Sequence, residues 1–243
     1  MKDSLFEIVS NRQIAKNTYE MVISGDISHI TAPGQFVNLK LDGFYLRRPI
    51  SVCDAVGARL TLIYKVVGEG TEKMAEMVRG EKLLTLTGLG NGYDTAVSGD
   101  RPLLIGGGAG VPPMYMLCKK LIKEGKHPTV ILGFGSRDEV FYEEEFRVLG
   151  ADVLVTTVDG SYGIKGFVTD ALKEMEYTHF FTCGPEPMLK AVYDKSETSG
   201  QFSFEERMGC GFGACMGCSC KTKYGNKRIC RDGPVLEREE IVW

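Results

Sequence analysis

The sequence contains no apolar run long enough to cross a bilayer, and its first residues, MKDSLFEIVSNRQ, lack the apolar core of a secretion signal. We therefore expect a cytoplasmic protein without a membrane span. Positive charge is not in excess either: the formal net charge is -3, and Lys and Arg form no stripe interleaved with aromatic residues. A nucleic acid partner is therefore not expected. Internal repeats and low-complexity tracts are also missing, which excludes a solenoid or a linker-like chain.

The composition is that of a globular protein with a real core. Hydrophobic residues make up 43% and charged residues 25% of the 243 residues. This length suits two domains and an appendage. Eight cysteines are present, and in a reducing compartment they are expected to bind metal or lie buried instead of forming disulfides.

The chain divides into three stretches of different character. Its first third reads as short β segments separated by Gly, Pro and Asp, which favours a small barrel. From Pro102 onward, apolar strands alternate with helical stretches, as in a parallel sheet with crossover helices. After about Gly200, glycine and cysteine dominate, and such a piece needs a metal to fold.

The sequence therefore predicts an α+β multidomain protein. We expect an antiparallel β-barrel domain over residues 1–97, an α/β parallel-sheet domain over 98–200, and a small C-terminal metal module over 201–243. Within the barrel, strands are expected at residues 20–24, 35–41 and 60–66.

Four cysteines near the C-terminus have the spacing of an iron-sulfur protein. Cys210, Cys215 and Cys218 follow C-x4-C-x2-C, and Cys230 completes the set; this is the plant-type 2Fe-2S pattern. The alternative, a structural zinc site, usually presents two closely spaced cysteine pairs, and only one C-x-x-C pair is present. Cys220 lies two residues beyond Cys218 and stays open as a substitute ligand.

Other features carry no chemistry in this interpretation. Cys53 and Cys118 stand alone in apolar surroundings and are expected to be small buried hydrophobes. The charged run 138–145 is expected to be a solvated helix face.

Two barrel segments combine groups suited to a flavin nucleotide. Arg48 offers a guanidinium for phosphate, and Ser51 offers a hydroxyl for a ring nitrogen. Downstream, an apolar strand runs into the turn 68–71 and a helix expected over 72–79 with Thr71 as N-cap. A glycine turn at a helix N-terminus binds anions well. An ordinary strand, turn and capped helix explains either segment alone, but the two together favour FAD.

Two glycine turns follow strands in the second domain. The strand 103–105 runs into Gly106-Gly107-Gly108-Ala109-Gly110 and then a helix, where a dinucleotide's phosphates approach the backbone. Val111 occupies the position of the third glycine of the usual motif. Cys183-Gly184-Pro185 forms a second turn of this kind. Because both follow parallel strands, they are expected to border one crevice that binds a nicotinamide dinucleotide.

In order, the motifs RRPIS, GEGT, GGGAGVPP and CGPEPM resemble the ferredoxin reductase superfamily, which joins an FAD barrel to a nicotinamide domain. The ending MGCGFGACMGCSC...CRDGPV resembles, more specifically, the electron-transfer subunits of class 1B dihydroorotate dehydrogenase. The resemblance spans nearly the whole chain. It implies a separate FMN-containing dihydroorotate dehydrogenase catalytic subunit as partner, with two copies of each subunit in a heterotetramer.

The resemblance also assigns roles to residues of this chain. It implies FAD contacts, with Ser51 near the reactive nitrogen, for Arg48, Pro49, Ile50, Ser51, Ile63, Tyr64, Lys65, Gly70 and Thr71. It implies NAD contacts for Gly106, Gly107, Gly108, Gly110, Cys183, Gly184 and Pro185. No side-chain acid or base is assigned to catalysis. Electrons are then expected to pass from the partner's FMN through the 2Fe-2S cluster and FAD to NAD in pyrimidine biosynthesis.

Two rival interpretations stay open at this stage. One is a subunit of a related NAD(P)H-dependent ferredoxin or sulfide reductase, and the other is a zinc-stabilised binding module without redox activity. The nucleotide preference is open as well, because Ser136 and Arg137 suit a 2'-phosphate whereas Asp138 and Glu139 favour NAD.

Overall fold

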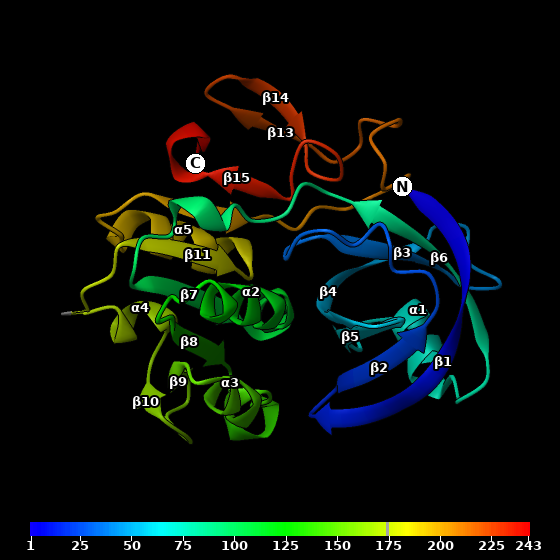
Figure 1. Ribbon diagram of the computed structural model, residues 1–243, viewed down its shortest axis with the longest axis horizontal. Helices are drawn as coiled ribbons and strands as arrows, with labels where there is room; N and C mark the ends of the chain where they lie inside the picture. Colours follow the sequence, from blue (N-terminus) through cyan, green and yellow to red (C-terminus); the bar gives the residue numbers. More distant parts are fainter. Residues whose placement is uncertain (174) are drawn as a thin grey trace.

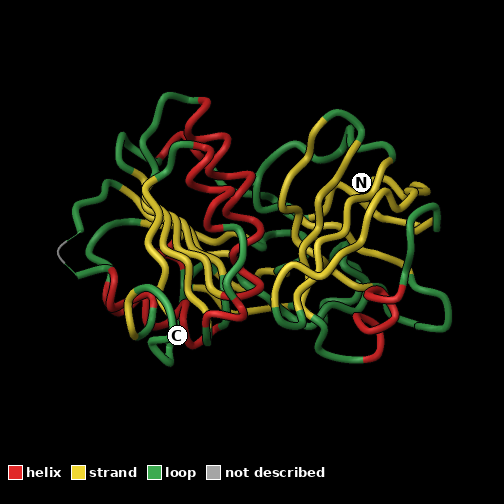
Figure 2. Tube along the Cα trace, turned by 90° about the horizontal axis from the view of Figure 1, so that it is seen from below, coloured by secondary structure: helices red, strands yellow, loops and turns green. Residues whose placement is uncertain are grey.

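The computed structural model of the protein describes residues 1–173 and 175–243, and it contains two lobes side by side with a short C-terminal layer across them (Figures 1 and 2). In this part of the chain, no helix is both long enough and apolar enough to span a membrane.

The first lobe is a closed antiparallel barrel with strand order β1-β2-β5-β4-β3-β6. Its strands alternate apolar residues, which puts Phe6, Met21, Val37 and Leu62 in one interior core. The strands are β1 (Lys2–Ala15), β2 (Thr18–Ser24), β3 (Phe36–Lys40), β4 (Arg48–Val56), β5 (Arg59–Lys65) and β6 (Lys82–Leu89). The predicted barrel is confirmed.

One helix, α1 (Glu69–Glu76), connects β5 to β6. The prediction that this helix starts at residue 72 after a Thr71 N-cap is wrong. Gly68 is the N-cap, and the Thr71 hydroxyl reaches back from the first turn to accept the amides of Val67 (2.9 Å) and Gly68 (3.2 Å). A hydroxyl in the first turn of a helix can accept these free amides as well as a hydroxyl at the N-cap can. The helix therefore begins before Thr71.

The second lobe is a seven-stranded sheet with order β10-β9-β8-β7-β11-β12-β15, parallel except for its last pair. The predicted parallel sheet with crossover helices is confirmed. Its elements are β7 (Pro102–Gly107), α2 (Val111–Lys123), β8 (Thr129–Phe134), α3 (Glu143–Leu149), β9 (Asp152–Thr157), β10 (Ile164–Lys165), α4 (Val168–Ala171), β11 (His179–Cys183), α5 (Glu186–Lys195), β12 (Gly200–Ser203) and β15 (Val235–Glu237), with short 3-10 turns at Thr95–Val97, Gly108–Gly110, Arg137–Glu139 and Arg238–Glu240.

Helices cover both faces of this sheet. Leu104 faces α2 and α3 in one core, whereas its neighbours Leu103 and Ile105 face α4 and α5 in another. The central strands β7, β8 and β11 are buried on both faces, which explains their nearly continuous apolar sequence. The predicted burial of Cys53 and Cys118 is confirmed.

The C-terminal layer is interwoven with the sheet. Its hairpin, β13 (Ser219–Thr222) and β14 (Gly225–Arg228), stands at the top of Figure 1, and β15 then returns antiparallel to β12. Strands this short lack a readable period, so the sequence did not predict that β12 and β15 complete the sheet. The domain boundaries expected at residues 97 and 200 stay a prediction.

Polar contacts join the two lobes. Lys119 of α2 donates to both carboxylate oxygens of Asp54 on β4, at 2.6 and 2.8 Å. The Tyr142 hydroxyl donates to Glu20 of β2 at 2.8 Å, and burial raises the pKa of Tyr142. Asp138 pairs with Lys16 of the barrel at 3.0 Å. The run 138–145 is therefore only partly the solvated helix face that the sequence suggested, because its first residues close the seam between the lobes.

Candidate functional site

The barrel side of the site is an anion cradle at the N-terminus of α1. Arg48 donates to the Leu46 carbonyl at 2.6 Å, and its guanidinium stacks 4.7 Å from the ring centroid of Phe44. A Cβ added to Gly70 would lie 2.1 Å from Arg48 Nε. The guanidinium therefore lies directly on the first turn of the helix, where only glycine leaves room for it. A fixed positive charge beside free helix amides suits a nucleotide's phosphates, so these residues fit FAD.

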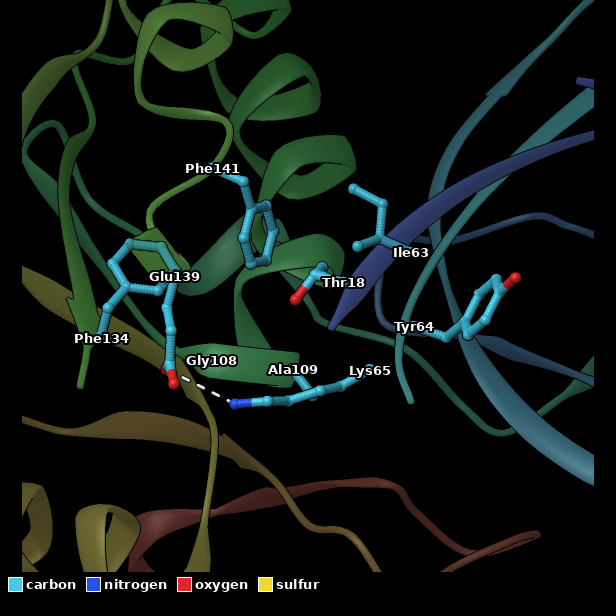
Figure 3. Close-up of a pocket in the computed structure, with 9 residues that line it drawn as sticks. All are labelled: Thr18, Ile63, Tyr64, Lys65, Gly108, Ala109, Phe134, Glu139 and Phe141. Atoms are coloured by element: carbon cyan, nitrogen blue, oxygen red, sulfur yellow. Dashed lines mark ion pairs between the residues drawn. The ribbon is translucent and has the colours of Figure 1, made fainter. Parts of the chain in front are cut away.

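A hollow between the lobes lies beside this cradle (Figure 3). Lys65 at the end of β5 pairs with Glu139 of the other lobe at 3.4 Å, beside Gly108 and Ala109. The Tyr64 ring points away from this hollow, and its hydroxyl donates to Asn11 at 3.0 Å. Burial raises the pKa of Tyr64 to about 12, so this phenol stays neutral.

The two glycine turns meet at the carboxyl ends of β7 and β11, where Gly106 pairs with Cys183. A Cβ on Gly110 would lie 2.1 Å from the Cys183 carbonyl oxygen, and one on Gly107 would lie 2.4 Å from the Met188 sulfur. Side chains at these glycines would therefore push the turns apart. The second helix starts at Val111 with prolines in its first turn, where missing amides cost little.

A cleft of about 360 Å³ unites these parts with the segment that leads to the cysteine loop. Of the residues implied by the resemblance, the cleft is lined by Arg48, Pro49, Ile50, Ser51, Ile63, Tyr64, Lys65, Thr71 and Cys183. The other implied residues lie near the cleft but do not line it: Gly70, Gly106, Gly107, Gly110, Gly184 and Pro185. Gly108 lines the smaller hollow.

The cleft also contains residues that the sequence did not single out: Phe36, Ser203, Phe204, Glu205, Glu206, Met208 and Pro234. Burial, with the nearby Glu205 carboxylate, raises the pKa of Cys183 to about 12, so its thiol is not a nucleophile. Met208 and Pro234 belong to the C-terminal motifs, but no motif places them beside Phe36 and residues 203–206, because these distant segments meet only in the folded chain.

The four predicted cysteines come together as two pairs. Cys210 Sγ accepts the amides of Ala214 (3.3 Å) and Cys215 (3.4 Å), and Cys215 Sγ accepts the Cys210 amide at 3.4 Å. In the second pair, Cys218 Sγ accepts the Cys230 amide at 3.4 Å. Cys218 and Cys230 are 2% exposed and pack in one apolar cluster.

This donor set fits a 2Fe-2S cluster, which takes two thiolates on each iron. Among residues 1–173 and 175–243, no three His, Cys, Asp or Glu side chains converge as a single metal ion requires. Burial raises the pKa of Cys210, but backbone amides that donate to its sulfur outweigh burial and bring the pKa to about 6. Amides turned toward a sulfur are the usual surroundings of cluster ligands.

Cys220 lies outside these pairs. It sits within β13 opposite Lys227, and burial raises the pKa of its thiol. Among the described residues, Cys220 takes no part in the amide-to-sulfur bonds that link Cys210 with Cys215 and Cys230 with Cys218. The geometry therefore favours Cys230 over Cys220 as the fourth ligand, which stays a prediction.

The barrel, the sheet with its glycine turns and the cysteine loop define a ferredoxin reductase-like protein with an added iron-sulfur module. Residues 205–242 match the iron-sulfur cluster binding domain of dihydroorotate dehydrogenase B, and residues 104–194 match the oxidoreductase NAD-binding domain.

Curated relatives identify the family more closely. The chain is 45% identical to the electron transfer subunit of dihydroorotate dehydrogenase B (NAD(+)) from Bacillus pumilus, over 100% of this chain and 99% of that protein. It is also 45% identical to the subunit of that name from Fusobacterium nucleatum, over 96% of each chain. The chain belongs to the family of dihydroorotate dehydrogenase B electron transfer subunits.

Solved structures agree with this fold. An NADH-dependent reduced ferredoxin-NADP oxidoreductase superposes with a TM-score of 0.89 at 30% identity, over 99% of this chain and 90% of that one. A ferredoxin NADP+ reductase from Neisseria gonorrhoeae superposes with a TM-score of 0.70 over 80% of this chain, and at 18% identity it shows the fold alone.

Proposed function

We propose that this chain is the electron-transfer subunit of an NAD-linked dihydroorotate dehydrogenase and passes electrons from a partner's FMN to NAD. The observation that carries this proposal is the shared cleft. All three regions of the chain line this cleft. They contribute strands β4 and β5 of the barrel, Ala109 and Cys183 of the glycine turns, and residues 203–206 and Met208 before the cysteine loop. A flavin site, a nicotinamide site and a cluster loop that border one cleft suit a relay.

When bound, FAD and the 2Fe-2S cluster supply the exchange between single electrons and hydride that nicotinamide alone cannot make. The chain's own residues bind and orient these groups. We assign Arg48, Gly70 and Thr71 to the FAD phosphates, and Pro49, Ile50, Ser51, Ile63, Tyr64 and Lys65 to the rest of FAD. We assign to the dinucleotide Gly106, Gly107, Gly108, Gly110, Cys183, Gly184 and Pro185. We assign to the cluster Cys210, Cys215, Cys218 and Cys230.

We further propose an FMN-containing catalytic subunit as the partner, in a heterotetramer of two copies of each chain. The cysteine loop supports this proposal, because Phe212 is 43% and Met216 55% exposed beside the cluster ligands. Exposed apolar side chains around a redox loop suit a docking surface. A cytoplasmic location stays part of the proposal.

An anaerobic titration tests the relay. NADH is added to the purified holoprotein, and bleaching of flavin and cluster is followed in the visible spectrum, with NADPH as the parallel arm. We expect NADH to reduce both chromophores and NADPH to be far slower, because the curated relatives are named as NAD(+)-linked. If neither nucleotide bleaches the protein, the relay is wrong.

The partner is tested by native co-purification and a dihydroorotate-dependent NAD reduction assay. We expect an FMN protein in equal amount, a mass of two copies of each chain by light scattering, and NAD reduction only by the complex. The 30% identity to the ferredoxin-NADP oxidoreductase supports a second candidate, a ferredoxin-linked reductase subunit. A complex that uses reduced ferredoxin and ignores dihydroorotate would establish that alternative.

A further inference from the structure

The outer face of β3 separates the flavin cleft from the cysteine loop. Val37 and Leu39 of this strand point into the barrel core, so Phe36 and Asn38 point outward. Phe36 lies opposite Ser51 of β4 and lines the cleft, and it also packs in the apolar cluster that contains Cys218 and Cys230. One strand face thus contacts both candidate redox sites.

Asn38, two residues further along this face, is a buried amide without an explained role. It is 1% exposed and pairs through its backbone with Pro49 of the flavin strand. Among residues 1–173 and 175–243, its side-chain oxygen has no hydrogen-bond partner. Buried polar groups are nearly always partnered, and the exceptions tend to serve a function.

The Asn38 amide nitrogen faces the cysteine loop. A Cβ built on Gly211 would lie 2.4 Å from Asn38 Nδ2, so the amide packs against the backbone of the residue that follows Cys210. Gly211 also has a φ of +77°, a conformation that a side chain would strain. Glycine is therefore required at position 211 for two reasons: the backbone conformation of the loop and its close contact with Asn38.

We propose that Asn38 is a positioning residue of the 2Fe-2S cluster. Its amide seats the loop at Gly211 against β3, and its N–H end faces the loop, where it favours negative charge on the nearby thiolates. This inference rests on the proposed function only in that the four cysteines hold a cluster. Groups beyond the metal ligands commonly set both the affinity and the potential of a metal site.

The test compares Asn38→Leu and Asn38→Asp with the unaltered holoprotein. Midpoint potential, electron paramagnetic resonance of the reduced cluster, and iron loss to a chelator are measured. We expect the potential to fall in Asn38→Leu and to fall further in Asn38→Asp, which places a carboxyl group where the N–H was. Iron loss should accelerate ~10-fold, the usual size of such effects.

Gln35→Leu is the matched control. Gln35 is also a buried amide, just before β3. Its side chain accepts the amides of Thr31 (2.8 Å) and Ala32 (3.1 Å) and donates to the Gly90 carbonyl (3.1 Å) instead of facing the loop. We expect this variant to lose stability while its cluster keeps the resonance and potential of the unaltered protein. Equal shifts in Gln35→Leu would assign the effect to general loosening and overturn the proposal.

A coupled pair of variants tests the contact itself. Gly211→Ala alone should lose iron quickly, because its methyl group meets the amide. Gly211→Ala combined with Asn38→Ala removes that clash, so the two substitutions together should cost less iron than the sum of the losses in Gly211→Ala and Asn38→Ala alone. Unchanged spectra and potentials in both Asn38 variants, or fully additive losses in the double variant, would refute the positioning role. If the unaltered protein shows no 2Fe-2S signal, the proposed function fails instead.

Discussion

The glycine turn at residues 106–110 and the cysteine loop at 209–217 are both rich in glycine, but they are held in different ways. In the turn, an added Cβ on Gly106 meets Val111 backbone at 2.9 Å, and one on Gly110 meets Cys183 backbone at 2.1 Å. In the loop, Gly209 and Gly217 are exposed, and their nearest neighbour is the Cys215 sulfur at 3.2 and 3.6 Å.

This difference separates a preorganised site from one that depends on its metal. Sheet hydrogen bonds and two apolar cores hold the turn in place, so it exists before a nucleotide binds. Apart from the packing of Gly211 on Asn38 and of Gly213 on Arg231, the loop is closed by thiols that accept backbone amides. The stability of such a loop comes from metal binding. Four measurements test this difference.

The largest expected effect is that of Cys230→Ser. This variant should lose the cluster completely while the barrel and sheet keep their structure and FAD, because Cys230 does not line the cleft that we assign to FAD. Iron analysis, flavin absorbance and circular dichroism measure the three parts. Cys220→Ser is the control and should keep its iron; the opposite result would make Cys220 the fourth ligand.

Gly110→Ala should have the next largest effect. The added methyl group forces the two glycine turns apart, and overpacking of this kind costs about 1–3 kcal/mol of unfolding free energy. NADH-driven flavin reduction should fall as well. Gly217→Ala is the matched control, for which the change should stay within ~0.5 kcal/mol. Denaturant unfolding of both variants measures the difference, and equal losses would contradict the contrast.

A smaller effect is expected for Arg228→Met. Arg228 donates to the Gly213 carbonyl at 3.1 Å and to Asp232 at 2.9 Å, and so braces the loop from the hairpin. Its loss should speed iron release to a chelator a few-fold without changing the NADH reaction of the flavin. Arg59→Met, on the barrel strand β5, is the control. An altered flavin reaction in Arg228→Met would show that loop and turn are not independent.

The smallest effect concerns pH. Burial lowers the pKa of His179 in β11 below its ordinary value. As the pH falls through about 6.5, the unfolded chain therefore binds more protons than the folded chain does. The contribution of neutral His179 to the free energy of unfolding is complete above that pH and is lost below it. Unfolding of the cluster-free Cys230→Ser protein across this range measures the slope. His179→Gln should flatten it, whereas the exposed His127→Gln should not.

The sequence predicted much of this architecture because its signals are local. Strand periods, the Pro112 and Pro113 helix start and the cysteine spacing depend on neighbouring residues alone. The sequence failed where distant segments complete an element. Strands β12 and β15 are too short to show a period and form only against β11 and each other. The start of α1 was misplaced because glycine and threonine both suit a cap.

Local sequence is enough to predict the types of site, since thiolates at C-x4-C-x2-C spacing and glycines after strands are fixed by covalent connection. How those sites meet depends on the fold of the whole chain. The register of β3 against β4 places Asn38 beside Pro49, and the Gly211 loop then packs on that amide. Such a contact depends on segments more than a hundred residues apart, and no local pattern encodes which side chain a folded strand presents to a distant loop.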